Sequence, residues 1–279
     1  MGRMLRDQVV LITGSSSGIG RALVGEFVRH GQRVVATARR PESIEDLARP
    51  GVLTRQLDVT DSGSVATAVA AAVQWGGRLD MVVNNAGFGL IGPVAELDLT
   101  ELRGQIETNL MGAVRLIQAV VPHMAARKAG RIVNIGSVSG VTATPFAGGY
   151  CASKAALHAI TDSLRMELAP FGIEVITVQP GAVKSRFGET SADGLERYRT
   201  GPSLYQEMAD AIEMRARLSQ DRPTPADDFV RHVVPRLLAQ NPSLVIRFGR
   251  GSGILPALAR LPVGTRDRIF SRKFGLPKR

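Results

Sequence analysis

The chain has 279 residues, of which 44% are hydrophobic and 22% charged, and these proportions exclude wholesale disorder. Of the formal net charge of +10, the segment 247–279 carries +8 (nine basic residues and one acidic), so the remainder is nearly neutral. Its single cysteine, Cys151, excludes an internal disulfide and a cysteine metal cluster, and the four histidines lack metal-ligand spacing, so we expect no metal site.

Strand-like and helix-like segments alternate along the chain. Short apolar runs predict strands at 9–13, 33–38, 52–59, 79–87, 130–137, 173–181 and 243–249. Helical spacing predicts helices at 19–30, 63–76, 100–127, 150–169 and 224–240, a short helix from Pro41, and Thr224 as the last N-cap. This alternation predicts an α/β fold: one Rossmann-type, doubly wound parallel sheet of about seven strands with helices on both faces.

The segment 182–224 is polar and interrupted by glycine and proline, with one helical stretch near 203–218. It follows the sixth strand, where an open α/β sheet has its ligand crevice, so we expect a mobile lid over a substrate. We assign 1–250 to the Rossmann-fold domain and 251–279 to a C-terminal appendage. An apolar substrate is favoured by these candidate lining residues: Val138, Val141, Phe146, Phe187, Tyr205 and Met208. The lid lacks a cluster of fixed charge, so a polyanionic substrate is not indicated.

The stretch TGSSSGIG, residues 13–20, joins the first predicted strand to the first predicted helix. Glycines there let the backbone approach a ligand closely, and the following helix N-terminus favours an anion such as a pyrophosphate. A glycine turn alone is weak evidence, because a tight strand–helix connection needs the same residues. Its position in the first βα unit favours a dinucleotide site.

The second strand ends in Arg39 and Arg40, where an acidic residue would bind the ribose 2′-hydroxyl of NAD. An arginine fork matches a phosphate instead, so the sequence favours NADP(H), with Arg39 the stronger candidate. The alternative is that both arginines are ordinary solvated loop residues.

Seven motifs in order resemble the short-chain dehydrogenase/reductase family across residues 6–185. They are TGSSSGIG, LDV with Asp58, NNAG (84–87), TNLMG with Asn109, IVNIGS with Ser137, the pair Tyr150 and Lys154, and PGAVKS (180–185). The strand end ATAR resembles the NADP-preferring branch that includes steroid and retinoid reductases, of the 17-beta-hydroxysteroid dehydrogenase type. Where the family often has threonine, this chain has Ser185, which keeps the hydroxyl.

The resemblance implies a role for each matching residue. Asn109, Ser137, Tyr150 and Lys154 match the catalytic tetrad of the family. The cofactor would be NADP(H), contacted by Gly14, Ser16, Ser17, Gly18, Ile19, Gly20, Arg39, Asp58, Val59, Asn85, Ala86, Gly87, Tyr150, Lys154, Pro180, Gly181, Val183 and Ser185. The partner would be a small carbonyl or alcohol substrate, and related chains often form homodimers or homotetramers through the helices predicted at 100–127 and 150–169.

Tyr150 and Lys154 lie four residues apart, so they share one face of the predicted helix. Since a nearby ammonium favours the phenolate, we expect Lys154 to lower the pKa of Tyr150 from its usual value of about 10. Tyr150 would then exchange a proton with the substrate oxygen while Ser137 holds that oxygen. By resemblance, Lys154 would bind the nicotinamide ribose, and Asn109 would support a water that relays protons to it.

The basic tail, 253–279, leaves three alternatives open. It packs on the body or a partner subunit, lies on an anionic membrane surface, or touches nucleic acid without specific recognition. Pro256 and Pro262 break it into short pieces, which weakens the membrane alternative. The N-terminus does not resemble a secretory signal, so we expect a cytoplasmic protein, with peripheral membrane contact as the alternative. The competing functional hypothesis is a non-catalytic dinucleotide-binding regulator, although all four tetrad residues are present.

Overall fold

The computed structural model describes residues 4–185 and 194–276, in which seven parallel strands form one sheet. The order across the sheet is β3-β2-β1-β4-β5-β6-β7. The strands are β1 (Val9–Ile12), β2 (Arg33–Ala38), β3 (Val52–Gln56), β4 (Met81–Asn84), β5 (Gly130–Ile135), β6 (Ile173–Pro180) and β7 (Val245–Phe248). The predicted fold class, a doubly wound Rossmann-type sheet, is confirmed; β2 has the predicted bounds, and the other six predicted strands are present with shorter bounds.

The central strands are buried on both faces. All four residues of β1 are fully buried, and its Val10 lies opposite Val34 of β2 and Met81 of β4. Branched apolar side chains suit this position because both faces of a parallel sheet are covered by helices. The strand order reverses between β1 and β4, and such a reversal opens a ligand crevice at the carboxyl ends of the strands.

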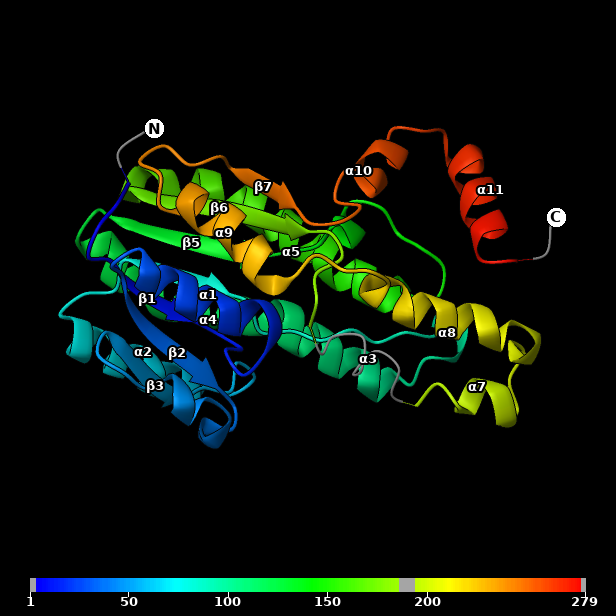
Figure 1. The fold of residues 1–279 in the computed structure, drawn as a ribbon, viewed down its shortest axis with the longest axis horizontal. Coiled ribbons are helices and arrows are strands. Elements are labelled where there is room, and N and C mark those ends of the chain that lie inside the picture. The colour runs from blue at the N-terminus through cyan, green and yellow to red at the C-terminus, as the bar shows by residue number, and fades with distance from the viewer. Residues whose placement is uncertain (1–3, 186–193, 277–279) are drawn as a thin grey trace.

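Two layers of helices cover the sheet (Figure 1). On one face lie α1 (Gly18–Arg29) and α9 (Ala226–Leu237), which contact each other and pack Phe27 and Phe229 into the core. The other face is covered by α2 (Ser62–Gly76), α4 (Gly112–Ala126) and α5 (Gly148–Leu168), whose apolar residues join a second core. This arrangement confirms the prediction of helices on both faces.

Three predicted elements differ in detail. The long helix predicted at 100–127 consists of α3 (Leu99–Ile106), a π-helical turn η3 (Glu107–Met111) and α4. The segment from Pro41 is a 3-10 helix, η1 (Pro41–Leu47). Thr224 is not the N-cap of α9: that position is Pro225, and the Thr224 hydroxyl instead accepts a hydrogen bond from the Arg250 amide at 2.8 Å. Three further short turns are 3-10 helices: η2 (Val94–Glu96), η4 (Val138–Gly140) and η5 (Ala169–Phe171).

The described part of the predicted lid segment is largely helical. It contains α7 (Arg197–Thr200), η6 (Gln206–Met208), α8 (Ala209–Arg217) and η7 (Leu218–Gln220). Tyr198, Ile212 and Ala216 are buried in a third apolar cluster that includes Phe146 and Cys151. The helical stretch predicted near 203–218 is therefore confirmed, and it packs beside the start of α5.

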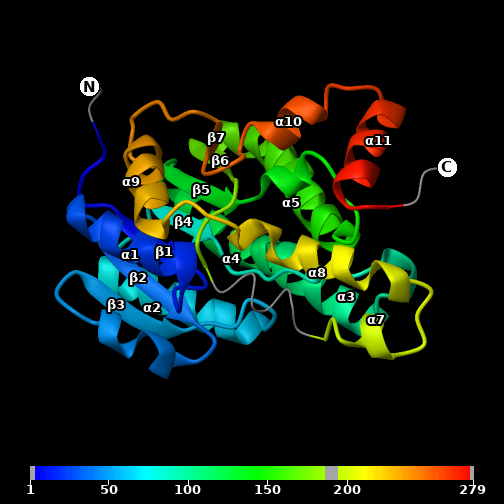
Figure 2. The ribbon, with the colours of Figure 1, turned by 45° about the vertical axis from the view of Figure 1, so that its right-hand side comes forward.

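The C-terminal segment forms two short helices, α10 (Ile254–Leu258) and α11 (Val263–Lys273), on the side of the molecule toward which the strands point (Figures 1 and 2). Phe270 and Phe274 are buried, and the Thr142 hydroxyl donates a hydrogen bond to the Leu255 carbonyl at 2.8 Å. Of the three alternatives for the tail, the structure thus supports packing on the body. Among the described helices, none has the length and apolarity needed to cross a bilayer.

Candidate active site

A cavity of about 700 Å³ lies at the carboxyl ends of the strands and collects most of the predicted site residues. The predicted residues in its lining are Gly14, Ser16, Ser17, Gly18, Ile19, Arg39, Asp58, Val59, Asn85, Ala86, Gly87, Ser137, Tyr150, Lys154, Pro180, Gly181, Val183 and Ser185. Gly20 and Asn109 do not line it and lie behind its wall. Parallel strands bring these residues together because their carboxyl ends meet at one edge of the sheet.

The glycine turn between β1 and α1 is tightly packed against its neighbours. Gly18 has a φ of +54°, and a Cβ there would lie 2.7 Å from the Ser185 Cβ. A Cβ on Gly20 would lie 2.2 Å from the Gly14 carbonyl oxygen and 2.5 Å from Nδ2 of Asn85. Side chains at these two positions would distort the turn, so it exposes bare backbone and the start of α1 to the cavity.

A hydrogen-bond network ties this turn to the end of β4. The Thr13 hydroxyl accepts hydrogen bonds from the amides of Asn85 and Ala86, each at 3.0 Å. Asn85 Nδ2 donates to the carbonyls of Thr13 and Gly14 at 2.9 and 3.2 Å. Sequence reasoning did not single out Thr13, whose role follows from the neighbouring positions of β1 and β4.

The end of β2 presents positive charge to the cavity. Arg39 and Arg40 are both exposed and both belong to its lining. Asp58 lies nearby: burial acts to raise its pKa, but hydrogen bonds from Thr60 and the charges of Arg39 and Arg115 outweigh burial and lower it. The residues at this end of the cavity fit a dinucleotide, because the glycine turn offers backbone donors and Arg39 offers a phosphate partner.

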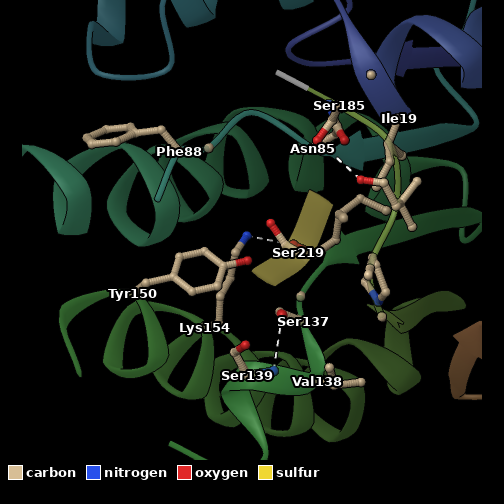
Figure 3. Close-up of a pocket in the computed structure, with 18 of the residues that line it drawn as sticks. Ile19, Asn85, Phe88, Ser137, Val138, Ser139, Tyr150, Lys154, Ser185 and Ser219 are labelled. Atoms are coloured by element: carbon tan, nitrogen blue, oxygen red, sulfur yellow. Dashed lines mark hydrogen bonds between the residues drawn. The ribbon is translucent and has the colours of Figure 1, made fainter. Parts of the chain in front are cut away.

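Ser137, Tyr150 and Lys154 meet at the other end of the glycine-lined wall (Figure 3). Tyr150 and Lys154 project from the first turns of α5, and Ser137 follows β5 as the N-cap of η4. The Lys154 ammonium donates a hydrogen bond to the Ile135 carbonyl at 2.8 Å. The Ser137 hydroxyl accepts one from the Ser139 amide at 3.1 Å. The shared helical face predicted for Tyr150 and Lys154 is confirmed.

Burial dominates the acid–base properties of this pair. It raises the pKa of Tyr150 to about 12, although a hydrogen bond with Ser137 and the charge of Arg215 act in the opposite direction. It also lowers the pKa of Lys154 to about 8. The expectation that Lys154 lowers the pKa of Tyr150 is therefore wrong for this structure: desolvation of the phenolate is the largest effect, and the positive charge that opposes it is that of Arg215.

Asn109 lies behind the cavity wall, in the π-helical turn between α3 and α4, and is 1% exposed. Its Nδ2 donates to the Phe88 carbonyl at 2.9 Å and to the Ser153 hydroxyl at 3.1 Å, and its Oδ1 accepts from the Phe88 amide at 3.0 Å. Both amide protons are thus used to join the loop after β4 to α5. A water molecule that relays protons at Asn109, as the resemblance implies, would therefore have to donate its hydrogen bond to an oxygen atom of this residue.

The apolar lining differs from the expected set. Val138 lines the cavity, whereas Val141, Phe146, Tyr205 and Met208 do not. The last three belong to the apolar cluster beside α8, and Phe187 lies outside the described residues. Apolar contacts come instead from the C-terminal helices and nearby turns: Leu218, Ile254, Leu255, Phe270 and Phe274. The pattern of the tail alone did not indicate this, because the tail packs on distant segments: Thr142 and Leu255, which share a hydrogen bond, are 113 residues apart.

Arg215 is a second residue that sequence reasoning missed. It lies on α8, is only 6% exposed, and lines the cavity together with Thr144. Its signal in the sequence is a charge three and four residues after Ile212 and Ala211, so that it shares a helical face with these apolar positions. Within the described residues, no group of three or more potential metal ligands is found.

Comparison with known proteins agrees with this geometry. The family model for short chain dehydrogenase matches residues 8–195. The chain is 39% identical over 201 residues to human dehydrogenase/reductase SDR family member 7; the match covers 68% of this chain but only 59% of that protein. A short-chain dehydrogenase of Penicillium ochrochloron is 36% identical over 277 residues, which is 98% of this chain and all of that protein.

Two solved structures are similar over most of the chain. A short-chain dehydrogenase from Streptomyces avermitilis has a TM-score of 0.78 and 30% identity, covering 96% of this chain and 95% of that one. A serine dehydrogenase complexed with NADP⁺ has a TM-score of 0.73 and 25% identity, covering 87% and 94% of the two chains. The matching family model, the full-length relative and the shared fold establish that this chain belongs to the short-chain dehydrogenase/reductase family of dinucleotide-dependent oxidoreductases.

Proposed function

We propose that the protein is an NADPH-dependent carbonyl reductase that converts a small, largely apolar ketone or aldehyde to an alcohol. The observation that carries this proposal is the meeting of Ser137, Tyr150 and Lys154 in the same cavity as the glycine turn. A phenol, a hydroxyl and an ammonium beside a dinucleotide site are suited to proton transfer at a carbonyl oxygen.

NADP(H), when bound, supplies the hydride for this chemistry. The turn from Gly14 to Gly20 would hold the pyrophosphate, and Arg39 the 2′-phosphate. Asp58 and Val59 would contact the adenine. The nicotinamide end would lie among the remaining predicted contacts: Asn85, Ala86, Gly87, Pro180, Gly181, Val183 and Ser185.

The roles of the tetrad follow from its surroundings. Tyr150 donates a proton to the carbonyl oxygen, and Ser137 holds this oxygen in place. Burial, which raises the pKa of Tyr150 to about 12, favours its protonated form, and this is the form that donates to a carbonyl oxygen. Lys154 would bind the cofactor ribose and pass a proton back to Tyr150, while Asn109 holds the loop after β4 against α5.

Replacement of the proton donor tests the activity. Tyr150→Phe removes the hydroxyl and keeps the ring, so we expect turnover to fall by at least about a hundredfold, since general acid catalysis contributes this much. NADPH affinity, measured by fluorescence titration, should stay within about threefold, or roughly 0.6 kcal/mol. Unchanged turnover in this variant would refute the proposed role and favour the non-catalytic regulator.

The cofactor preference is tested at the end of β2. We expect Arg39→Asp to weaken NADPH binding by at least about tenfold, because a carboxylate would repel the 2′-phosphate, and to leave NADH binding less affected. Arg55→Asp, an exposed charge reversal on β3 outside the cavity lining, is the matched control. Equal affinities for NADPH and NADH in the unmodified protein would contradict the assignment.

Assembly and localisation complete the proposal. We propose a cytoplasmic homo-oligomer formed through the helical segment 100–127 and α5. This is supported by the exposed side chains of Met111 in η3 and Met166 in α5, at 43% and 71%. Light scattering of the purified protein measures the oligomeric state.

Membrane contact remains the alternative for the tail, since Ile254 and Val263 are 62% and 61% exposed near basic residues. Retention on anionic vesicles, with and without residues 253–279, separates the alternatives.

A further inference from the structure

Arg215 is a buried guanidinium in the wall of the same cavity as Ser137 and Tyr150. It lies near the end of α8, and 6% of its surface is exposed. Its Nε donates a hydrogen bond to the Thr144 hydroxyl at 2.8 Å, and Thr144 is itself buried. The side chain is therefore held in a defined orientation against the cavity rather than extending into solvent.

The charge of Arg215 has no carboxylate partner in the part of the chain that the structure describes. Its neighbours on α7 and α8 behave differently: Arg199 pairs with Asp210 at 2.7 Å, and Arg217 pairs with Glu213 at 2.6 Å. Those two arginines are 45% and 75% exposed. Of these three arginines, Arg215 is thus the least exposed to water and the one without an ionic partner among the described residues.

The ionisable groups that influence Arg215 are Cys151 and Tyr150, and a thiol and a phenol are ordinarily uncharged at neutral pH. Burial lowers the pKa of Arg215, but a guanidinium keeps its proton in proteins. In residues 4–185 and 194–276, the bond from Nε to Thr144 is its only hydrogen bond, and its two terminal nitrogens are not among the fully buried polar atoms without a partner, so we infer that the guanidinium is open to the cavity it lines. Since a buried, unpaired charge is costly, its retention beside a cavity indicates an anion supplied by a ligand.

The rest of this end of the cavity is mainly apolar, with Leu255, Phe270 and Phe274 in its lining. Resting on the proposed reductase function, we infer that the substrate is a carbonyl compound with an apolar body and one carboxylate group, and that Arg215 binds this carboxylate. A planar guanidinium matches a carboxylate through two parallel N–H···O hydrogen bonds. The carbonyl oxygen of the same molecule lies at Tyr150 and Ser137.

One carboxylate suits the charge of this site better than a polyanion. Arg215 is a single cation, whereas Arg39 and Arg40 line the opposite, cofactor end of the cavity. The absence of a fixed-charge cluster in the segment 182–224, noted from the sequence, agrees with one negative charge on the substrate. Its apolar body agrees with the lining that the C-terminal helices provide.

Pairs of acids and methyl esters test the inference. The probes are benzoylformate, 3-benzoylpropionate and 4-benzoylbutyrate, each with its ester, so that the spacing between carbonyl and carboxylate varies. We expect kcat/KM to favour the acid by at least about tenfold in one or more pairs, because an ionic hydrogen bond is lost in the ester. In Arg215→Met this preference should vanish because KM for the acids rises. Turnover of the esters should stay within about threefold of the unmodified enzyme.

Arg217→Met is the matched control, since Arg217 lies on the same helix but is exposed and paired with Glu213. It should keep the acid preference. If the unmodified enzyme reduces the esters as well as the acids, the inference falls while the reductase function stands. A proportional loss for acids and esters in Arg215→Met, with a shifted pH profile, would mean that Arg215 acts through Tyr150, and this also overturns it.

A binding measurement separates the inference from the activity. 4-Phenylbutyrate has a carboxylate but no ketone or aldehyde, so it can bind without being reduced. It should raise the melting temperature of the NADP⁺-loaded protein more than its methyl ester does. This protection should persist in Tyr150→Phe and disappear in Arg215→Met. That pattern would uphold carboxylate binding even if no ketone were reduced, whereas equal protection by acid and ester would overturn it.

Discussion

Lys154 illustrates how burial changes a single residue of the site. Its folded-state pKa is about 8, below the ordinary 10.5, because the ammonium is removed from water. Between these pH values the folded protein holds fewer protons than the unfolded chain, so stability rises with pH across this window. Below pH 8 both states are protonated, and the full cost of burying the charge remains. The residue that the proposed chemistry needs therefore destabilises the fold at neutral pH.

We predict that Lys154→Met stabilises the cofactor-free protein at pH 7 by up to about 3 kcal/mol, the free energy that corresponds to this pKa difference. The gain should shrink as the pH rises through 8 and vanish near the ordinary lysine pKa of about 10.5, while turnover is lost. Urea unfolding at several pH values measures it. Lys128→Met, at an exposed turn position, is the control. A destabilised Lys154→Met protein at pH 7 would show that the hydrogen bond to Ile135 outweighs desolvation.

At the scale of elements, the start of α1 is determined by close packing against the turn before it. A Cβ on Gly20 would lie 2.2 Å from the Gly14 carbonyl oxygen, a backbone atom that cannot move independently. Gly25, on the same helix, has no heavy atom within 4 Å of its Cβ position. Close packing therefore leaves no room for a side chain at Gly20, whereas Gly25 on the same helix has room for one.

We expect Gly20→Ala to lower the free energy of unfolding by about 1–3 kcal/mol, as overpacking does, and to weaken dinucleotide binding because the turn must shift. Gly25→Ala should instead stabilise the protein by about 0.5–1 kcal/mol, since alanine restricts the unfolded chain and favours the helix. Denaturant unfolding and cofactor titration test both. Similar effects of the two substitutions would rule out the packing explanation.

At the scale of the whole molecule, the C-terminal helices complete the cavity. Phe274 is 1% exposed and Phe270 6%, and both line the cavity whose opposite wall is formed by the sheet. A helix as short as α11, with 11 residues, is marginal in isolation, so its contacts with the body must hold it in place. Substrate binding should therefore depend on residues far along the chain from the tetrad.

We predict that Phe274→Ala releases this segment from the body. Truncating a buried phenylalanine typically costs about 3–5 kcal/mol, and a helix this short is only marginally stable without its packing contacts. KM for carbonyl substrates should rise by at least about tenfold while NADPH affinity changes less than about threefold. Steady-state kinetics and limited trypsin digestion near Arg266 and Arg268 measure the release. Val263→Ala, at a position 61% exposed, should leave both unchanged. An unaltered KM in Phe274→Ala would contradict this role of the tail.

Short-range patterns in the sequence were sufficient for the fold and for most of the candidate site. Alternating strands and helices predicted the parallel sheet, and spacing alone put Tyr150 and Lys154 on one helical face. Glycine spacing and Arg39 at a strand end predicted the cofactor end of the cavity. These features depend on local periodicity and on the rule that parallel strands end at one edge, so the sequence by itself determined them.

Only the tertiary structure decided what depends on burial and on contacts between distant segments. Asn109 lies behind the cavity wall, Phe274 forms part of it, and Arg215 is buried in it without a carboxylate partner among the described residues. The raised pKa of Tyr150 belongs to the same class, because desolvation depends on everything packed around the hydroxyl. Desolvation and charge pairing depend on groups that the fold brings together from distant parts of the chain, so they cannot be predicted from a short stretch of sequence.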